Sequence, residues 1–469
     1  MNDEFRWIED GDINDLISRF EKMLGSQMHL FFDVNEFEAL VDYFIDFQEF
    51  DKAEIAIESA LQQHPSVSSF IIRKAKLQAL NGKYYEALEE LNQTELLEPA
   101  SDELYISKAE IYSMMNKHEL AIEQYNKAIP LSENPEDIYS VIAFEYENLN
   151  DYPNAIKNLK KALALKPESE NIIHEIAFFF DITNREEEAI KFFKDFIDTN
   201  PYSKVGWFNL GIFYNQLELF EKAIEAYEYT LAIDDKFSSA YFNIANSLSG
   251  MQRYTEAIRY YKETFKYEAP EPITYYYIGE SYEQINDLRN AMRYFNKALE
   301  ISDSLADAWA GLGRVFIAQD NDITAINYYE KAVEIMPGNT EYKFDLAMIH
   351  MKNTNYETAI SLFDKITKLD PYNIESWINQ SACVFALEDV DGAIEIIEEA
   401  ITTNKENALL WYRLAGYLHV SGKVQQAYFY IESALKLNHE QHTELLDLIP
   451  HLYSDTRFIE LLGVYKDNG

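Results

Sequence analysis

The residues best placed to bind a metal ion lie near the start of the chain. Asp10, Asp12, Asn14 and Glu21 match the first, third, fifth and twelfth places of a calcium-binding loop. Such a loop needs a glycine at its sixth place for a sharp turn, and this chain has Asp15 there. Acidic residues are also common at the start of a helix, where they cap N–H groups and interact favourably with the helix dipole. We therefore expect a helix start here and no calcium site.

Histidines near the C-terminus are a second candidate for metal binding. His439, His442 and His451 are close in sequence, but no cysteine or suitably spaced carboxylate accompanies them. The chain also lacks a Gly-rich phosphate loop, a nucleophile elbow and an HExxH motif. We therefore expect no metal site, no cofactor and no catalytic residues, and we predict that the protein is not an enzyme.

The charge of the chain limits the classes of partner. The 469 residues carry a formal net charge of −41. Such a surface repels phosphate backbones and anionic membranes, so we expect no nucleic-acid binding and no membrane binding. It would attract a basic protein, although a plain solvated surface explains the same charge.

The expected compartment is the cytoplasm. The single cysteine, Cys383, excludes an internal disulfide and fits a reducing environment. The acidic first residues do not resemble a secretory signal, and eighteen apolar residues never occur in succession. We therefore predict a cytoplasmic protein without a membrane-spanning segment.

Alanines recur every 34 residues, and they indicate the helices that must position any binding residues. Four residues after each alanine comes a large apolar residue, so that the two share one face of a helix. The alanines are Ala53, Ala87, Ala121, Ala155, Ala189, Ala223, Ala257, Ala291, Ala325, Ala359, Ala393 and Ala427. The residues four places later are Ile57, Leu91, Tyr125, Leu159, Phe193, Tyr227, Tyr261, Phe295, Tyr329, Phe363, Ile397 and Ile431.

A second small residue precedes each alanine by twelve places, except in the first repeat, which has Val41. These residues are Ala75, Ala109, Ala143, Ala177, Gly211, Ala245, Gly279, Gly313, Ala347, Ser381 and Ala415. We expect two antiparallel helices in each repeat, with the two small residues facing each other where the helices cross. Prolines end the helices, because proline cannot continue one. They are Pro65, Pro99, Pro167, Pro201, Pro337 and Pro371.

This pattern resembles the tetratricopeptide repeat, in which W-x2-L-G-x2-Y is followed by A-x3-F and then P at a period of 34. The matching residues are Trp207, Leu210, Gly211, Tyr214, Ala223 and Tyr227, and again Trp309, Leu312, Gly313, Phe316, Ala325, Tyr329 and Pro337. The resemblance covers residues 34–441. It implies an all-α fold, a right-handed α-solenoid superhelix of twelve 34-residue hairpins. The first helices would line the concave face, and the second helices would form the convex back.

The two ends depart from the pattern, and we expect them to cap the array. Residues 1–33 read as an acidic arm followed by a capping helix near residues 13–24, which would stop at Gly25. The arm contains Phe5, Trp7 and Ile8; it either packs or frays at the end, or it docks as a linear peptide into the groove or a partner. Residues 442–469 read as a degenerate thirteenth repeat that caps the C-terminus, and Pro450 breaks its first helix.

By the same resemblance, one stripe of each first helix faces the groove. The candidate partner-binding residues on this stripe are Phe144, Phe178, Phe208, Asn209, Phe242, Asn243, Tyr276, Tyr277, Arg314 and Asn379. The fifth to eighth repeats combine aromatic and amide side chains. Aromatic rings offer large contact areas, so we predict that an extended segment of a partner binds there.

Three asparagines, Asn209, Asn243 and Asn379, hold the same place in their repeats. This is similar to the asparagine ladder of the O-linked N-acetylglucosamine transferase repeats, which holds an extended peptide by its backbone. A carboxamide can pair with both the C=O and the N–H of such a peptide. Tyr277, Gly311 and Asp345 interrupt the ladder, and the aromatic residues could instead pack between neighbouring hairpins.

The carboxylate clamp of chaperone-binding tetratricopeptide modules is not expected. It needs Lys and Asn, then Asn, then Lys and Arg on three successive first helices, and no triple in this chain supplies them. Arg73 and Lys76 form the one basic spot in the groove, and Glu38, Asp42 and Glu110 flank it. We expect these carboxylates to neutralise it.

These features predict a non-enzymatic scaffold or adaptor that binds a polypeptide segment in its concave groove. Two alternatives stay open. One is an acidic chaperone or assembly factor that shields a basic client protein, and the other is a regulatory subunit of a separately encoded enzyme. Binding by charge should weaken steeply with salt, whereas recognition by aromatic and amide groups should not.

Overall fold

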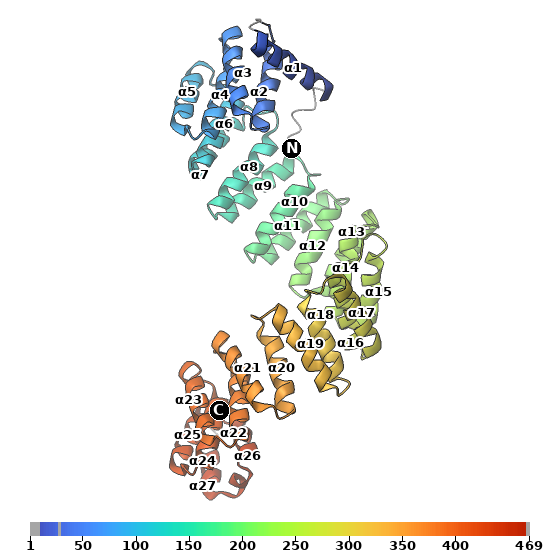
Figure 1. The fold of residues 1–469 in the computed structure, drawn as a ribbon, viewed down its shortest axis with the longest axis vertical. Coiled ribbons are helices and arrows are strands. Elements are labelled where there is room, and N and C mark those ends of the chain that lie inside the picture. Colours follow the sequence, from blue (N-terminus) through green and yellow to red (C-terminus); the bar gives the residue numbers. More distant parts are fainter. Residues whose placement is uncertain (1–9, 27–29, 466–469) are drawn as a thin grey trace. The chain divides into compact units, whose positions relative to one another are not determined.

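A computed structural model describes residues 10–26 and 30–465, and the regular secondary structure of these residues is helical, without a strand. The arm residues Phe5, Trp7 and Ile8 lie outside the described residues. The chain forms two compact units, unit 1 (Met1–Asp235) and unit 2 (Lys236–Gly469). Figure 1 labels their helices.

The helices of unit 1 are α1 (Asp10–Ser26), α2 (Val34–Asp46), α3 (Phe50–Gln63), α4 (Ser68–Leu80), α5 (Tyr84–Leu97), α6 (Asp102–Met114), α7 (His118–Ala128), α8 (Pro135–Asn148), α9 (Tyr152–Leu165), α10 (Glu170–Ile182), α11 (Glu186–Thr199), α12 (Lys204–Gln216) and α13 (Phe220–Ile233). Those of unit 2 are α14 (Ser238–Gly250), α15 (Tyr254–Thr264), α16 (Pro272–Gln284), α17 (Leu288–Ile301), α18 (Ala306–Ile317), α19 (Asp322–Ile335), α20 (Thr340–Lys352), α21 (Tyr356–Leu369), α22 (Ile374–Ala386), α23 (Val390–Thr403), α24 (Ala408–Val420), α25 (Val424–Leu437), α26 (Thr443–Leu448) and α27 (Thr456–Tyr465), with the 3-10 helices η2 (Glu440–His442) and η3 (Pro450–Ser454).

From α2 to α25 the helices form hairpins, in which an even-numbered first helix packs against the odd-numbered second helix that follows it. The second helix holds the hairpin together through its alanine and the large residue four places later. The alanines from Ala53 to Ala427 are 0% exposed, and the large residues from Ile57 to Ile431 are at most 4% exposed. The 34-residue pattern therefore marks the core of both units.

The small residue of the first helix faces an aromatic ring where it is glycine. A Cβ atom added to Gly211 would lie 2.4 Å from Cε1 of Tyr227, and one added to Gly313 would lie 2.5 Å from Cε2 of Tyr329. The space beside these glycines is therefore filled by the large residue four places after the alanine. A tyrosine ring occupies more volume than a small aliphatic side chain. In a close-packed interior, the absence of a side chain at the glycine leaves room for the ring.

The turn inside each hairpin contains one residue in the left-handed conformation, again every 34 residues. Their φ angles lie between 49° and 83°. They are Gln48, Gly82, Asn116, Asn150, Asn184, Glu218, Gln252, Asn286, Asp320, Thr354, Glu388 and Gly422. The N–H of the next residue donates to a carbonyl five places earlier, as from Lys423 to Leu418 O at 2.9 Å. This is the Schellman closure of a helix, and here it forms around many residue types besides glycine.

Tryptophan side chains close several turns between hairpins. Nε1 of Trp207, Trp309 and Trp411 donates to the backbone carbonyl six residues earlier, at 2.8–2.9 Å. Lys343 holds the equivalent place in its repeat, and its Nζ donates to Pro337 O. These bonds tie the first helix to the turn that precedes it and so define the junction between hairpins.

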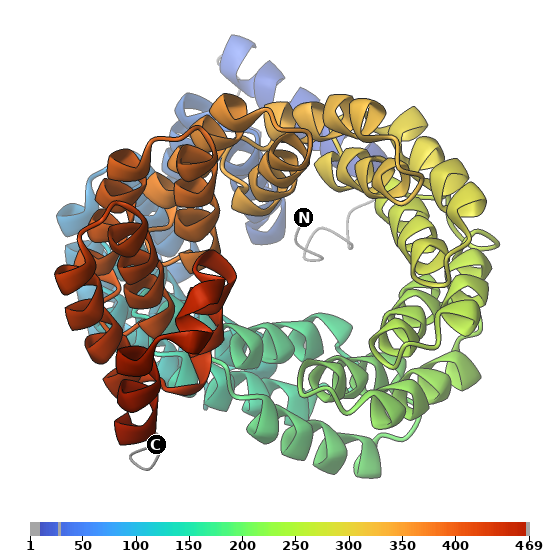
Figure 2. The same ribbon diagram turned by 90° about the horizontal axis from the view of Figure 1, so that it is seen from below.

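Successive first helices approach one another more closely than successive second helices do. In unit 1, α2 contacts α4, α4 contacts α6, and α10 contacts α12; in unit 2, α16 contacts α18 and α22 contacts α24. Among second helices of the described residues, a comparable contact joins only α25 and α27. The first helices therefore lie on the inner side of each curved stack. Figure 2 shows the curved path of unit 2, from yellow-green to red.

The first helix, α1, packs onto the first hairpin. Leu16 and Phe20 lie in one core cluster with Phe44, and Arg19 pairs with Glu36 at 2.7 Å. The helix extends beyond the predicted 13–24 at both ends and includes Gly25, which does not adopt the left-handed conformation common at the end of a helix.

The last helices begin and end where the sequence indicates. Helix α26 ends at Leu448, and Pro450 begins η3. Helix α27 begins after Asp455, whose carboxylate accepts the N–H of Phe458 at 2.9 Å. Proline stops one helix, and a capping aspartate starts the next.

Candidate functional site

The predicted binding residues divide between the two units. Phe144, Phe178, Phe208 and Asn209 belong to unit 1, and Phe242, Asn243, Tyr276, Tyr277, Arg314 and Asn379 belong to unit 2. All of them lie on first helices, which form the inner side of each stack. Each unit therefore has its own candidate surface.

In unit 1, two of the three predicted phenylalanines lie at the surface. Phe144 on α8 is 56% exposed, and Phe178, at the equivalent place on α10, is 52% exposed. Phe208 on α12 is 9% exposed, and its ring centroid lies 5.7 Å from that of Tyr227. Phe208 thus packs within its hairpin, whereas Phe144 and Phe178 can contact another molecule.

Two of the three asparagines of the predicted ladder donate an amide hydrogen to a backbone carbonyl of their own helix. Nδ2 of Asn209 donates to Val205 O at 2.8 Å, and Nδ2 of Asn243 donates to Ser239 O at 3.0 Å. Asn209 is also 3% exposed, so it does not present its amide to solvent. Asn243 and Asn379 are half-buried on α14 and α22. Asn209 belongs to unit 1, whereas Asn243 and Asn379 belong to unit 2 and lie on first helices four hairpins apart.

In unit 2, the predicted aromatic residues form a cluster. The ring of Tyr277 stacks on that of Tyr261 with centroids 5.9 Å apart, and it meets the ring of Phe242 edge-on at 5.8 Å. Tyr276 joins the cluster at 5.3 Å from Tyr277 and lies 5.8 Å from Phe295. Tyr276 is 9% exposed, whereas Tyr277 and Phe242 are half-buried at the surface of the cluster.

Carboxylates adjoin this cluster and are held by tyrosine hydroxyls. The Tyr276 hydroxyl donates to Glu280 at 2.9 Å, and the Tyr342 hydroxyl donates to Asp307 at 2.5 Å. Asp345 on α20 accepts a hydrogen bond from the hydroxyl of Tyr329 on α19 at 3.0 Å. We call these side chains the tyrosine–carboxylate face, which comprises Tyr276, Tyr277, Glu280, Glu283, Asp307, Arg314, Tyr342 and Asp345.

Arg314 is the one basic residue of the tyrosine–carboxylate face, and it is already paired. Its Nε lies 2.9 Å from Glu283 Oε1, and its second guanidinium nitrogen lies 3.0 Å from Oε2. This two-pronged pair joins α16 to α18 and neutralises the arginine. Glu280, Asp307 and Asp345 then give the face a negative charge.

Burial and nearby carboxylates raise the pKa values of Tyr277 and Asp345 on this face. The pKa of Tyr277 lies above its usual value because burial and the charges of Glu280 and Asp307 disfavour the phenolate. The pKa of Asp345 is raised by burial and by Glu341, although the bond from Tyr329 opposes this. Tyr277 therefore lies near enough to Glu280 and Asp307 to feel their charges, and a cation bound beside it would be stabilised by both carboxylates.

In unit 1, Arg73 is neutralised, as the sequence indicated. It forms a two-pronged pair with Asp42 at 2.7 and 2.9 Å, and it lies 3.1 Å from Glu103 and 3.6 Å from Glu38. Burial and the neighbouring Glu38 and Asp42 raise the pKa of Glu103, against the opposing effect of Arg73. Lys76, the other member of the predicted basic spot, is exposed.

Sequence reasoning missed Asp307, Tyr329 and Tyr342. Tyr329 was assigned only to the hairpin core, yet its hydroxyl reaches Asp345 on the following first helix. The signal was available in the acidic residues at places 307 and 341, which repeat at a spacing of 34 on the stripe that faces the groove. Which hydroxyl reaches which carboxylate depends on side-chain direction and not on this spacing.

The described residues hold neither a metal-binding cluster nor a membrane-spanning helix. No group of three or more histidine, cysteine, aspartate or glutamate side chains in this part of the chain is arranged to hold a metal ion. No helix among the same residues is both long and apolar enough to cross a bilayer.

Family models match several stretches of the chain. The tetratricopeptide repeat model matches residues 102–135, 136–169 and 206–235, a second model of this repeat matches residues 242–306, and the model of anaphase-promoting complex, cyclosome, subunit 3 matches residues 318–400. No curated protein matches the chain.

Solved structures of tetratricopeptide proteins resemble parts of the chain. A tetratricopeptide repeat protein from Parabacteroides merdae has 18% identity over 53% of this chain and 98% of its own, with a TM-score of 0.39. The pilF protein of Pseudomonas aeruginosa has 17% identity over 43% of this chain and 91% of its own, with a TM-score of 0.38. YrrB, described as a TPR protein with an unusual peptide-binding site, has 18% identity over 39% and 95%, with a TM-score of 0.32.

Stacked helical hairpins with a repeating core define an all-α solenoid. The repeat pattern and the matching family models identify its family, and the chain is a tetratricopeptide repeat protein. Such repeats form scaffolds for protein–protein interaction, and that general role applies to this chain.

Proposed function

We propose that the inner side of unit 2 binds an extended, basic segment of a partner protein at the tyrosine–carboxylate face. The observation that carries this proposal is the position of Tyr277, which is half-buried beside Glu280 and Asp307. A lysine or arginine side chain placed there would meet an aromatic face and two carboxylates at once.

The surroundings of the face support a chain-like ligand. Phe242 and Asn243 border it on α14, and Asn379 lies further along the stack on α22. Arg314 is neutralised by its ion pair with Glu283, so it would not repel a cation bound to the face. The net charge of −41 would also speed the approach of a basic partner.

Fluorescence anisotropy with a labelled nona-arginine peptide tests this proposal. Tyr277→Ala removes an aromatic contact without changing the charge, and we expect the peptide to bind about tenfold or more weakly, since loss of a central aromatic anchor costs about 2 kcal/mol. Asp307→Asn removes one negative charge from the face, and we expect a loss of about 1 kcal/mol.

Matched variants separate this site from the general attraction of a polycation to an acidic protein. Asp303→Asn removes the same charge in the exposed turn before α18, and Tyr372→Ala removes an aromatic side chain that is 71% exposed. Both should bind the peptide as the unmodified protein does. Equal losses for Asp303→Asn and Asp307→Asn would show that only bulk charge acts, and the proposal would fail.

We also infer that Phe144 and Phe178 give unit 1 a separate apolar contact surface. Two exposed rings at equivalent places on neighbouring first helices support this inference. Phe144→Ser with Phe178→Ser should reduce capture of a partner by full-length protein while leaving the melting temperature unchanged. Unchanged capture would refute it.

Finally, we infer that residues 34–441 form twelve tetratricopeptide repeats between an N-terminal cap within residues 1–33 and a C-terminal cap within residues 442–469. The left-handed residues, one in every 34 from Gln48 to Gly422, support this count. Deletion of one whole 34-residue repeat should retain helical circular dichroism, whereas deletion of half a repeat should not.

A further inference from the structure

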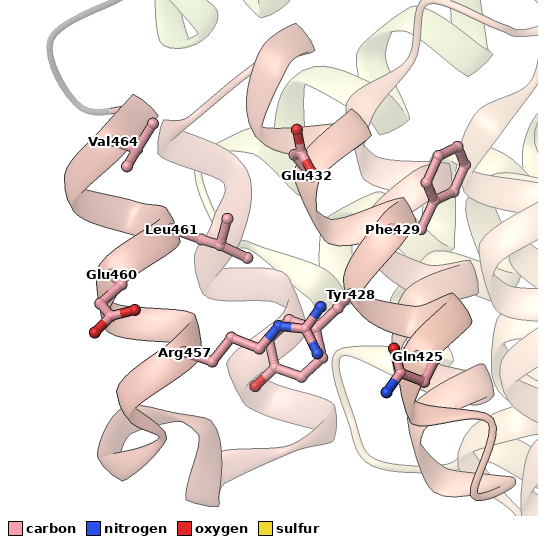
Figure 3. Close-up of a pocket in the computed structure, with 8 residues that line it drawn as sticks. All are labelled: Gln425, Tyr428, Phe429, Glu432, Arg457, Glu460, Leu461 and Val464. Atoms are coloured by element: carbon pink, nitrogen blue, oxygen red, sulfur yellow. The ribbon is translucent and has the colours of Figure 1, made fainter.

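A hollow of about 360 Å³ lies between α25 and α27, away from the tyrosine–carboxylate face. Tyr428 and Leu461 contribute apolar surface to it, and Glu432, Arg457 and Glu460 contribute polar groups. Figure 3 shows Leu461 and Arg457 reaching from α27 toward α25. A cavity of about 150 Å³ already holds a benzene molecule, so this hollow has room for an aromatic ring.

An exposed ring stands at the edge of the same hollow. Phe429 is 65% exposed, and in Figure 3 it points away from α27. Phe429 also lines a second hollow, of about 320 Å³, together with Glu398 and Leu418. The surface therefore places a projecting apolar ring directly beside a depression that could receive one.

The charges on this surface are also of both signs. The guanidinium of Arg457 lies 4.0 Å from the ring centroid of Tyr428 and, in the described part of the chain, has no carboxylate within ion-pair distance. Glu460, three residues further along α27, likewise has no basic partner there. Arg457 and Glu460 are both exposed and can pair with groups of another molecule.

We propose that this surface binds a second copy of the chain in a two-fold symmetric dimer. In such an interface each copy presents the same patch, so the patch must complement itself. A projecting ring beside a hollow, and an unpaired cation beside an unpaired anion, meet that requirement. Phe429 of each copy enters the hollow of the other, and Arg457 of each copy pairs with Glu460 of the other.

The net charge predicts an unusual salt dependence for this dimer. Two copies of a chain with a net charge of −41 repel each other at a distance, and salt screens that repulsion. Salt screens the Arg457–Glu460 pairs less than this repulsion, because they are in direct contact within the interface. Dimerisation should therefore strengthen from about 50 mM to about 500 mM NaCl, whereas binding of a basic peptide should weaken.

Sedimentation equilibrium of the full chain at about 500 mM NaCl, where the repulsion is screened, is the first test. We expect a dimer, and we expect Phe429→Ala to raise the dimer dissociation constant about tenfold or more, because the ring is the central apolar anchor. Tyr372→Ala serves as the control, since it also removes an exposed ring from unit 2. A monomer at about 100 µM protein, a concentration at which even a weak specific dimer would form, overturns the proposal and would leave the hollow to an aromatic side chain of a different protein.

A pair of charge variants tests the symmetry itself. Arg457→Glu places like charges opposite each other in a homodimer, and so does Glu460→Arg, so each variant alone should dimerise more weakly. Mixing the two variants restores opposite charges at both contacts between the copies, and a heterodimer should form. Circular dichroism melts confirm that each variant is folded. Failure of the mixture to associate while the unmodified chain dimerises would rule out this interface.

Discussion

Replacement of Thr354 by glycine should stabilise the protein locally. Thr354 lies in the turn between α20 and α21 with φ 60°, a conformation in which a β-branched side chain is strained. The hydrogen bonds from Thr354 N to Met351 O at 3.0 Å and from Asn355 N to His350 O at 2.9 Å hold it there.

The expected gain follows from two opposing effects. The left-handed conformation costs a non-glycine residue about 1–2 kcal/mol, which glycine does not incur. Glycine loses more backbone entropy on folding, which costs about 0.5–1 kcal/mol. With the middle of each range, the net gain for Thr354→Gly is about 0.7 kcal/mol.

Native-state hydrogen exchange is the appropriate assay, because each hairpin of a solenoid is stabilised mainly by its neighbours. Amides of α20 and α21 should exchange about two- to fivefold more slowly in Thr354→Gly, as the free-energy difference implies. Amides of α14 and α15, several hairpins away, should not change.

Two glycines supply the controls. Gly422→Ala places a side chain at φ 83° and should speed exchange in α24 and α25. Gly338→Ala lies in a turn without positive φ and with nothing within 4 Å of the added atom, so it should be neutral or slightly stabilising. Faster exchange in Thr354→Gly, or slower exchange in Gly422→Ala, would refute the argument from backbone strain.

Three further predictions concern the core and the junctions. Ala223→Leu should cost about 1–3 kcal/mol in urea unfolding, because Ala223 is 0% exposed; an unchanged midpoint would contradict the assignment of the helix crossing. Trp309→Phe should cost about 1 kcal/mol by the same measurement, since it removes the bond to Asp303 O; no loss would show that the bond does not stabilise the junction. Burial lowers the pKa of Lys343, so the unfolded chain keeps this proton to a higher pH than the folded chain does. The free energy of unfolding should therefore rise as the pH increases from the folded pKa toward about 10.5. Lys343→Met should remove that rise, as measured by unfolding curves at about pH 8 and pH 10.

The sequence predicted the hairpin core well because that core repeats. The alanines and the large residues four places later lie where the 34-residue period puts them, and they are buried. The left-handed turns could not be predicted in the same way. Glu218, Thr354 and Glu388 are not residues that favour this conformation, and backbone hydrogen bonds impose it on them.

The candidate site was less predictable, because side-chain hydrogen bonds do not follow the repeat. Asn209 and Asn243 occupy equivalent places, yet Asn209 is buried and Asn243 is only half-buried. Asparagine in a helix can bond the carbonyl four residues earlier, and both residues do so. Arg314, predicted to contact a partner, instead pairs with Glu283 from the preceding first helix.

The unbroken 34-residue spacing also has a mechanical consequence. When a solenoid is pulled from its ends, hairpins can detach one after another, since each contacts mainly its neighbours. A released hairpin of 34 residues adds at most about 110–120 Å of extended chain. No insertion alters this length from Gln48 to Gly422, so successive rupture events in an optical trap should add equal increments of contour length. The chain would then lengthen under load as a series of identical links.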